Sequence, residues 1–97
     1  MNTIQTLQFR DEIKRLFPFI DERALRSIVE REARRVVVAH LSPTSFTALA
    51  IAAVAGYIRH NMTHYDQLLT DGRHTRYLAA QRVRPLVASV ESEWGRR

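Results

Sequence analysis

Residues 41–58 read LSPTSFTALAIAAVAGYI and contain no charged side chain. Ser42 followed by Pro43 predicts the start of a helix, because a serine oxygen can accept a free N–H and a proline at the first helical position loses no donor. From Phe46 to Ile58 the residues are apolar on nearly all sides and rich in alanine, which is typical of a helix with close neighbours. We therefore expect a central helix here, with Gly56 at the closest approach of a neighbour.

The same stretch has nearly the length of a membrane-spanning helix. However, it includes serine, threonine, proline and glycine residues, and its many alanines contribute little transfer free energy. The first ten residues also lack the basic and continuous apolar segments of a signal peptide. We expect a buried core helix and a cytoplasmic protein without membrane association.

Composition bounds the class of protein. A chain of 97 residues with 45% hydrophobic and 26% charged residues is expected to form one soluble domain over residues 1–97. The absence of cysteine excludes a disulfide scaffold, a thiolate metal site and a cysteine nucleophile. The net charge is +5, and all basic residues but Lys14 are arginines, which permits an anionic partner without requiring one.

Two amphipathic patterns precede the central run. The first predicts a short helix that ends at Phe17, because Pro18 follows. Its apolar residues are Phe9, Ile13, Leu16, Phe17 and Ile20. Asp21 is the expected N-cap of the second helix, whose apolar stripe is Leu25, Ile28, Val29, Val36 and Ala39. The branched residues 36–38 would suit a strand, but the sequence offers no second strand-like run, so no sheet is expected.

Downstream, the pattern predicts that the central helix continues to Leu69, with Met62 and Tyr65 on its inner face, and stops at residues 71–72, Asp-Gly. A final helical stripe of Ala79, Val83, Val87, Val90 and Trp94 runs through Pro85, which should either bend one helix or split it in two. The predicted fold is all-α, a small compact bundle of about four helices around a central alanine-rich helix.

Residues 57–69, YIRHNMTHYDQLL, resemble the signature of domain-of-unknown-function family 2293, in which Ile-Arg-His is followed by Thr, then Tyr-Asp and two leucines. The resemblance covers about residues 16–96. The chain departs from the family pattern at His64 and at the Ala79-Ala80 pair, which weakens any role for those side chains. The resemblance implies a compact helical domain and supplies no reaction, substrate or cofactor.

Within the motif, Arg59, Thr63 and Asp66 lie three and four residues apart on a stripe beside the one that carries Tyr65. One interpretation is structural: Thr63, Tyr65 and Asp66 belong to a network in which Asp66 bonds to Arg59 and which locks this helix to the last one. The alternative is that Arg59 and His60 are exposed to a ligand.

The sequence offers no recognisable catalytic constellation. His60 and His64 have the spacing of two metal ligands on a helix, but the glutamate of a zinc hydrolase and any third ligand are missing. No nucleophile elbow or phosphate-binding glycine loop occurs. We expect no enzymatic activity, metal, cofactor or small-molecule substrate.

A basic segment indicates the most specific function. No acidic residue occurs between Gly72 and Val90, where Arg73, Arg76, Arg82 and Arg84 surround an aromatic residue, and Arg59 and His60 could adjoin this patch. Such a surface predicts binding of DNA or RNA through the phosphate backbone, without sequence-specific base reading. The alternative is a protein-interaction or homo-oligomerisation module that covers surplus apolar surface.

Overall fold

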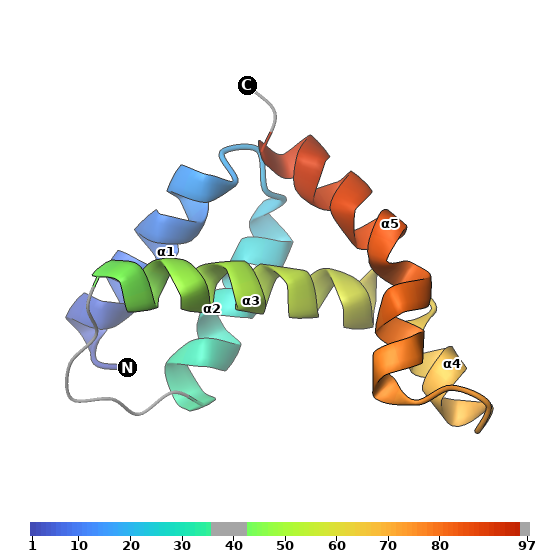
Figure 1. The fold of residues 1–97 in the computed structure, drawn as a ribbon. Coiled ribbons are helices and arrows are strands. Elements are labelled where there is room, and N and C mark those ends of the chain that lie inside the picture. The colour runs from blue at the N-terminus through green and yellow to red at the C-terminus, as the bar shows by residue number, and fades with distance from the viewer. Residues whose placement is uncertain (36–42, 96–97) are drawn as a thin grey trace.

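A computed structural model of the chain describes residues 1–35 and 43–95, and within these ranges every regular element is a helix (Figure 1). The described elements are α1 (Thr3–Leu16), α2 (Glu22–Arg35), α3 (Pro43–Asn61), α4 (Tyr65–Thr70) and α5 (Arg76–Gly95). The prediction of a small all-α bundle is therefore confirmed. The predictions for Val36, Ala39 and Ser42 concern residues outside the described ranges.

Helix α1 begins earlier than its apolar stripe indicates because its N-terminus is doubly capped. The Asn2 side chain accepts the Gln5 N–H at 2.8 Å, and the Gln5 side chain accepts the Asn2 N–H at 3.0 Å, which forms a capping box. The helix ends at Leu16, one residue before the predicted end, and Phe17, which precedes Pro18, is its C-cap. Asp21 then caps α2 by accepting the Ala24 N–H at 3.1 Å, as predicted.

The main core lies where α1, α2, α3 and the C-terminal part of α5 meet. Its buried side chains include Phe9, Ile13, Leu25, Ile28, Ala50, Val54, Ile58 and Trp94. The carbonyl of Trp94 accepts the Phe19 N–H at 2.8 Å and so ties the end of α5 to the turn between α1 and α2 (Figure 1). The alanine-rich helix α3 is central, as predicted, because it contacts each of the other four helices.

A second, smaller core joins α4 to the first half of α5. Its buried residues are Tyr65, Ala79 and Val83. Helix α5 runs unbroken through Pro85 and therefore spans both cores. Of the two expectations for this segment, one helix and not two separate helices is correct. None of the described helices is long and apolar enough to cross a membrane.

The carboxylate of Glu12 gives the fold a pH dependence. Arg15 donates to both of its oxygens, at 2.6 and 2.9 Å, and Thr47 of α3 also donates to it. These hydrogen bonds lower the pKa of Glu12 from 4.5 to about 2, and the bond from Arg15 has the largest effect. Because the pKa in the folded state is depressed, the stabilisation is complete above pH 4.5 and is lost as the pH falls towards 2.

We expect Glu12→Gln to remove this contribution. The variant should be less stable than the parent protein at neutral pH, and its free energy of unfolding should fall less steeply on acidification. Urea unfolding followed by circular dichroism at several pH values measures both effects. Glu30→Gln is the matched control, since Glu30 is exposed and has no ion pair within the described ranges. Parallel curves for parent and Glu12→Gln would contradict the role of this carboxylate.

Candidate functional site

The prediction of one continuous helix as far as Leu69 is wrong, because the helix is interrupted at the joint between α3 and α4. Helix α3 ends at Asn61, and residues 62–64 separate it from α4. The hydroxyl of Thr63 donates to the Arg59 carbonyl at 2.5 Å and accepts the Tyr65 N–H at 3.2 Å. These local bonds offer the backbone an alternative to the helical ladder. Met62 is consequently 48% exposed, whereas Tyr65 remains buried.

Asp66 pairs with His60 and not with Arg59, so the predicted Arg59–Asp66 bond is wrong. The break before α4 brings the Asp66 carboxylate to His60, with 2.7 Å between Oδ1 and Nδ1. The His60 ring also meets Tyr65 edge-on, with the ring centroids 5.1 Å apart. Thr63 and Asp66 thus hold the joint between α3 and α4 together, with His60 as the partner of the carboxylate. The predicted network was to lock this helix to the last one, but only Tyr65 packs against α5, in the smaller core.

Arg59 is held by packing. Its guanidinium carbon lies 5.2 Å from the centre of the Tyr65 ring, within the range of a cation–π contact. The prediction of a close neighbour at Gly56 is wrong for the described residues: among them a Cβ built at Gly56 would meet only Nη2 of Arg59, at 3.9 Å. Nε of Arg59 is buried without a hydrogen-bond acceptor, and no carboxylate in the described part of the chain pairs with this side chain. Arg59 therefore stacks on Tyr65 and keeps one buried donor, Nε, without a partner among the described residues.

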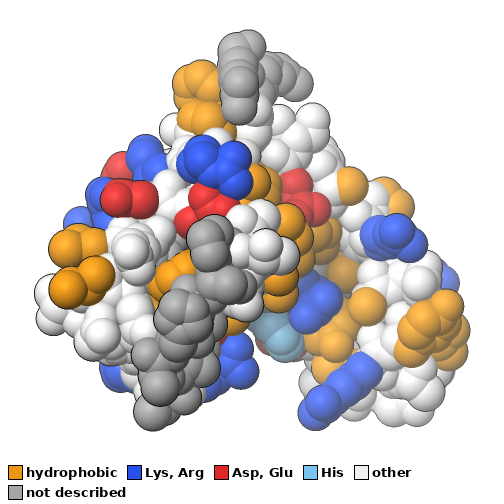
Figure 2. Space-filling view, turned by 60° about the vertical axis from the view of Figure 1, so that its left-hand side comes forward, with side chains coloured by type: hydrophobic (Ala, Val, Ile, Leu, Met, Phe, Trp, Pro, Cys, Tyr) orange, Lys and Arg blue, Asp and Glu red, His pale blue; other side chains and the backbone are white. Residues whose placement is uncertain are grey.

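A pocket of about 320 Å³ lies between α2 and α3 beside this guanidinium. Its basic lining residues are Arg31, Arg35, Arg59 and His60. Glu32 also lines the pocket; it is 5% exposed and accepts from Nη2 of Arg35 at 3.0 and 3.2 Å. Figure 2 shows basic side chains and a histidine where this face of the molecule is hollowed.

The sequence did not identify Arg31 and Arg35 as site residues, because they belong to the polar face of an amphipathic helix. Their spacing of four residues shows that they share one side of α2. Only the packing of α2 against α3 places that side opposite Arg59.

The four remaining predicted arginines surround the start of α5. Arg73 lies in the loop before the helix and Arg76 is its first residue. All four are exposed, and within residues 1–35 and 43–95 none has a carboxylate within 4 Å. At 100° per residue, Arg82 and Arg84 point about 160° apart, so they occupy opposite flanks of the helix.

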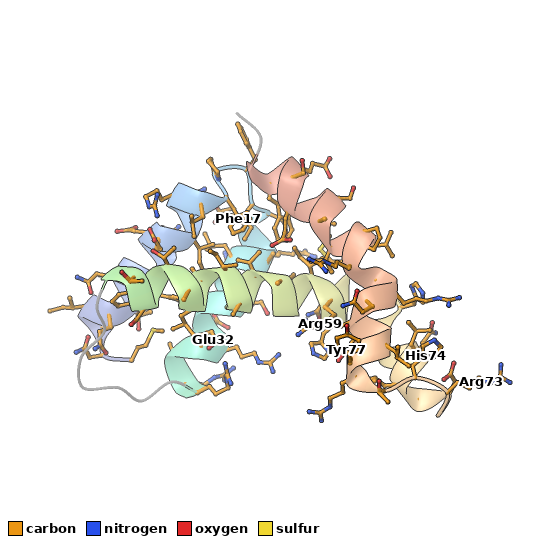
Figure 3. The ribbon with its side chains drawn as sticks, in the orientation of Figure 1. Phe17, Glu32, Arg59, Arg73, His74 and Tyr77 are labelled. Carbon is orange, nitrogen blue, oxygen red and sulfur yellow. The ribbon has the colours of Figure 1, made fainter. Side chains whose placement is uncertain are left out.

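The six predicted binding residues therefore form two groups. Arg59 and His60 belong to the pocket, whereas Arg73, Arg76, Arg82 and Arg84 encircle the first half of α5. Figure 3 places Arg73 at the far end of the loop between α4 and α5, well away from Arg59. We call the second group the α5 arginines.

The model of one protein family, described as an uncharacterized conserved protein (DUF2293), matches residues 12–95. The chain belongs to the DUF2293 family. The matched region holds α2 to α5 entire, with both groups of basic residues, and includes only the last residues of α1. Comparisons of this DUF2293 protein with curated proteins and with solved structures found no match.

The histidines of the DUF2293 domain do not gather into a metal centre in the part of the chain that the structure describes. No group of three or more His, Cys, Asp or Glu side chains there could hold an ion. His60 is engaged with Asp66, and Nδ1 of His74 lies 3.6 Å from Asp71 in the loop after α4. That loop turns at Gly72, whose φ of +74° suits glycine, as the Asp-Gly stop predicted.

Proposed function

We propose that this DUF2293 domain binds nucleic acid through the phosphate backbone, using the α5 arginines. One observation carries the proposal: four exposed guanidinium groups stand in a segment without acidic residues, and none has a carboxylate partner in the described ranges. Unpaired arginines can bind phosphates without first breaking an internal ion pair. Their planar forks also match phosphate geometry.

The arrangement around α5 favours a duplex. Arg82 and Arg84 occupy opposite flanks of the solvent-facing side of α5, so each can reach a different phosphate strand when this side lies along a groove. Tyr77, which is 70% exposed, lies seven residues from Arg84 and therefore on the same flank. Phosphate contacts carry no sequence information, so unrelated oligonucleotides should compete within about tenfold of one another.

A pair of charge-matched variants tests this surface. The first changes the α5 arginines, Arg73, Arg76, Arg82 and Arg84, to glutamine. The control changes four other exposed arginines, Arg10, Arg23, Arg26 and Arg34, to glutamine, and so loses the same net charge. We expect the first variant to bind a fluorescent duplex at least about tenfold more weakly than the parent, and the control to stay within about threefold, because only close contacts release counterions. Equal losses would show that net charge alone attracts the nucleic acid.

Self-association is the second candidate function, and a separate feature of α5 favours it. Leu78 and Leu86 are 49% and 47% exposed and lie on one side of the helix with Arg82 between them. Exposed apolar side chains at such spacing suit contact with another helix. Light scattering separates the two functions: a dimer that dissociates when Leu78 and Leu86 become lysine supports self-association, and a monomer at all concentrations rules it out.

A further inference from the structure

The pocket between α2 and α3 has an uncompensated positive charge. Glu32 is the one carboxylate among the described residues of its lining, and both oxygens of that carboxylate accept from Arg35. Arg31 and Arg59 have no carboxylate within 4 Å in the described part of the chain. Three arginines and one glutamate leave a net charge of +2, which matches a dianion.

Arg59 is positioned before any ligand arrives. The Tyr65 ring lies on one side of its guanidinium, and Gly56 leaves room for Nη2 beside the helix. Its Nε is buried without an acceptor among the described residues, so the Nη groups are the donors that a ligand in the pocket could reach. A fixed fork also costs less side-chain entropy on binding than a mobile one.

The size of the pocket restricts the ligand. About 320 Å³ is close to the lower limit for small-molecule sites, which begin near 300 Å³, and is too small to enclose a nucleic-acid duplex. Arginine forks bind phosphate oxygens in pairs, and a phosphate monoester carries close to two negative charges at neutral pH.

We infer that this pocket binds a phosphate monoester, with Arg31 and Arg59 as its principal ligands and Glu32 holding Arg35 in place. The site is separate from the α5 arginines and does not depend on the proposed nucleic-acid surface. A free phosphate ester and the 5′-phosphate of a nucleic-acid end present the same group, so the test compares these two sources.

The experiment follows the Nε–H signal of Arg59 by two-dimensional NMR of the full chain. Titration with methyl phosphate should shift this signal saturably, whereas dimethyl phosphate, which has one charge fewer, should bind at least about tenfold more weakly. Equal responses to the two esters, or no saturable shift up to ~50 mM methyl phosphate, would overturn the inference.

Substitutions in α2 test the site without altering the packing around Arg59. Arg31→Gln, at an exposed position, should weaken methyl phosphate binding by about tenfold or more, and Arg26→Gln on the same helix should leave it unchanged. An unchanged affinity of Arg31→Gln would contradict the assignment. Arg31→Gln should still bind a duplex with 5′-hydroxyl ends as well as the parent protein, so failure of the pocket and failure of the α5 arginines give different results.

A final arm identifies the source of the phosphate. Short oligonucleotides with a 5′-phosphate and with a 5′-hydroxyl are compared by the same Arg59 signal. If the 5′-phosphate oligonucleotide binds at least about tenfold more tightly than both the 5′-hydroxyl oligonucleotide and methyl phosphate, the pocket accepts nucleic-acid ends. If it binds no more tightly than methyl phosphate, the pocket accepts free esters; in both cases the monoester site stands.

Discussion

Replacing Phe9 with alanine should lower the free energy of unfolding by about 3 to 5 kcal/mol. Phe9 is fully buried and packs into the main core with Ile13 of the same helix. The substitution removes a large apolar surface and leaves a cavity between α1 and its neighbours, which the fixed helix ends cannot fully close. Since small domains are stable by only about 5 to 15 kcal/mol, this one change removes much of the total.

Leu7→Ala provides the matched control on the same helix. Leu7 is 57% exposed, so its truncation should cost no more than about 0.5 kcal/mol. Urea unfolding followed by circular dichroism compares the two variants with the parent protein.

The comparison also tests the extent of the domain. The family match begins at residue 12, so Phe9 lies outside it. Equal, small effects of Phe9→Ala and Leu7→Ala would mean that the first half of α1 does not belong to the folded unit. A large effect of Phe9→Ala alone is the result expected of a single domain that includes α1.

The elements that the sequence predicted well are those with local signals. Pro18 and Asp21 act on their immediate neighbours, so the end of α1 and the start of α2 follow from the residues themselves. The apolar stripe of α5 likewise predicted burial of Ala79, Val83 and Trp94.

The joint between α3 and α4 could not be predicted from periodicity. The spacing of Ile58, Met62, Tyr65 and Leu69 is helical throughout, and the pattern continues across residues that are not helical. Helix α3 ends where side chains compete with backbone N–H groups for carbonyl acceptors. The side chain of Asn61 donates to the Tyr57 carbonyl, and the Thr63 hydroxyl donates to the Arg59 carbonyl. Asn-x-Thr at this point is the signal that could have indicated a break.

The pocket was beyond the reach of sequence reasoning for a different reason. An amphipathic pattern shows which side of α2 is polar, but the polar residues that face α3 depend on how the two helices cross. Arg31 and Arg59 are 28 positions apart, and no local rule connects them. The α5 arginines, in contrast, lie in one segment and could be found by charge alone. The sequence suggested that they form one patch, but the helix places Arg82 and Arg84 on opposite flanks.

The second large expected effect is the salt dependence of nucleic-acid binding. If each of the four α5 arginines contacts one phosphate of a duplex, the logarithm of the association constant should fall with the logarithm of salt concentration with a slope of about −3.6. Raising salt from ~50 to ~200 mM would then weaken binding about 150-fold. A single strand, with a slope of about −2.8, would lose about 50-fold. Each arginine changed to glutamine should make the slope shallower by about one.

Fluorescence anisotropy of a labelled duplex of arbitrary sequence, titrated with the full chain at several salt concentrations, measures this slope directly. Binding through the α5 arginines predicts a linear plot with a slope between about −3 and −4, reduced nearly to zero in the variant without those arginines. A parent protein that shows no binding at ~50 mM salt, or binding whose slope is shallower than about −1, would contradict phosphate-backbone recognition by this DUF2293 domain.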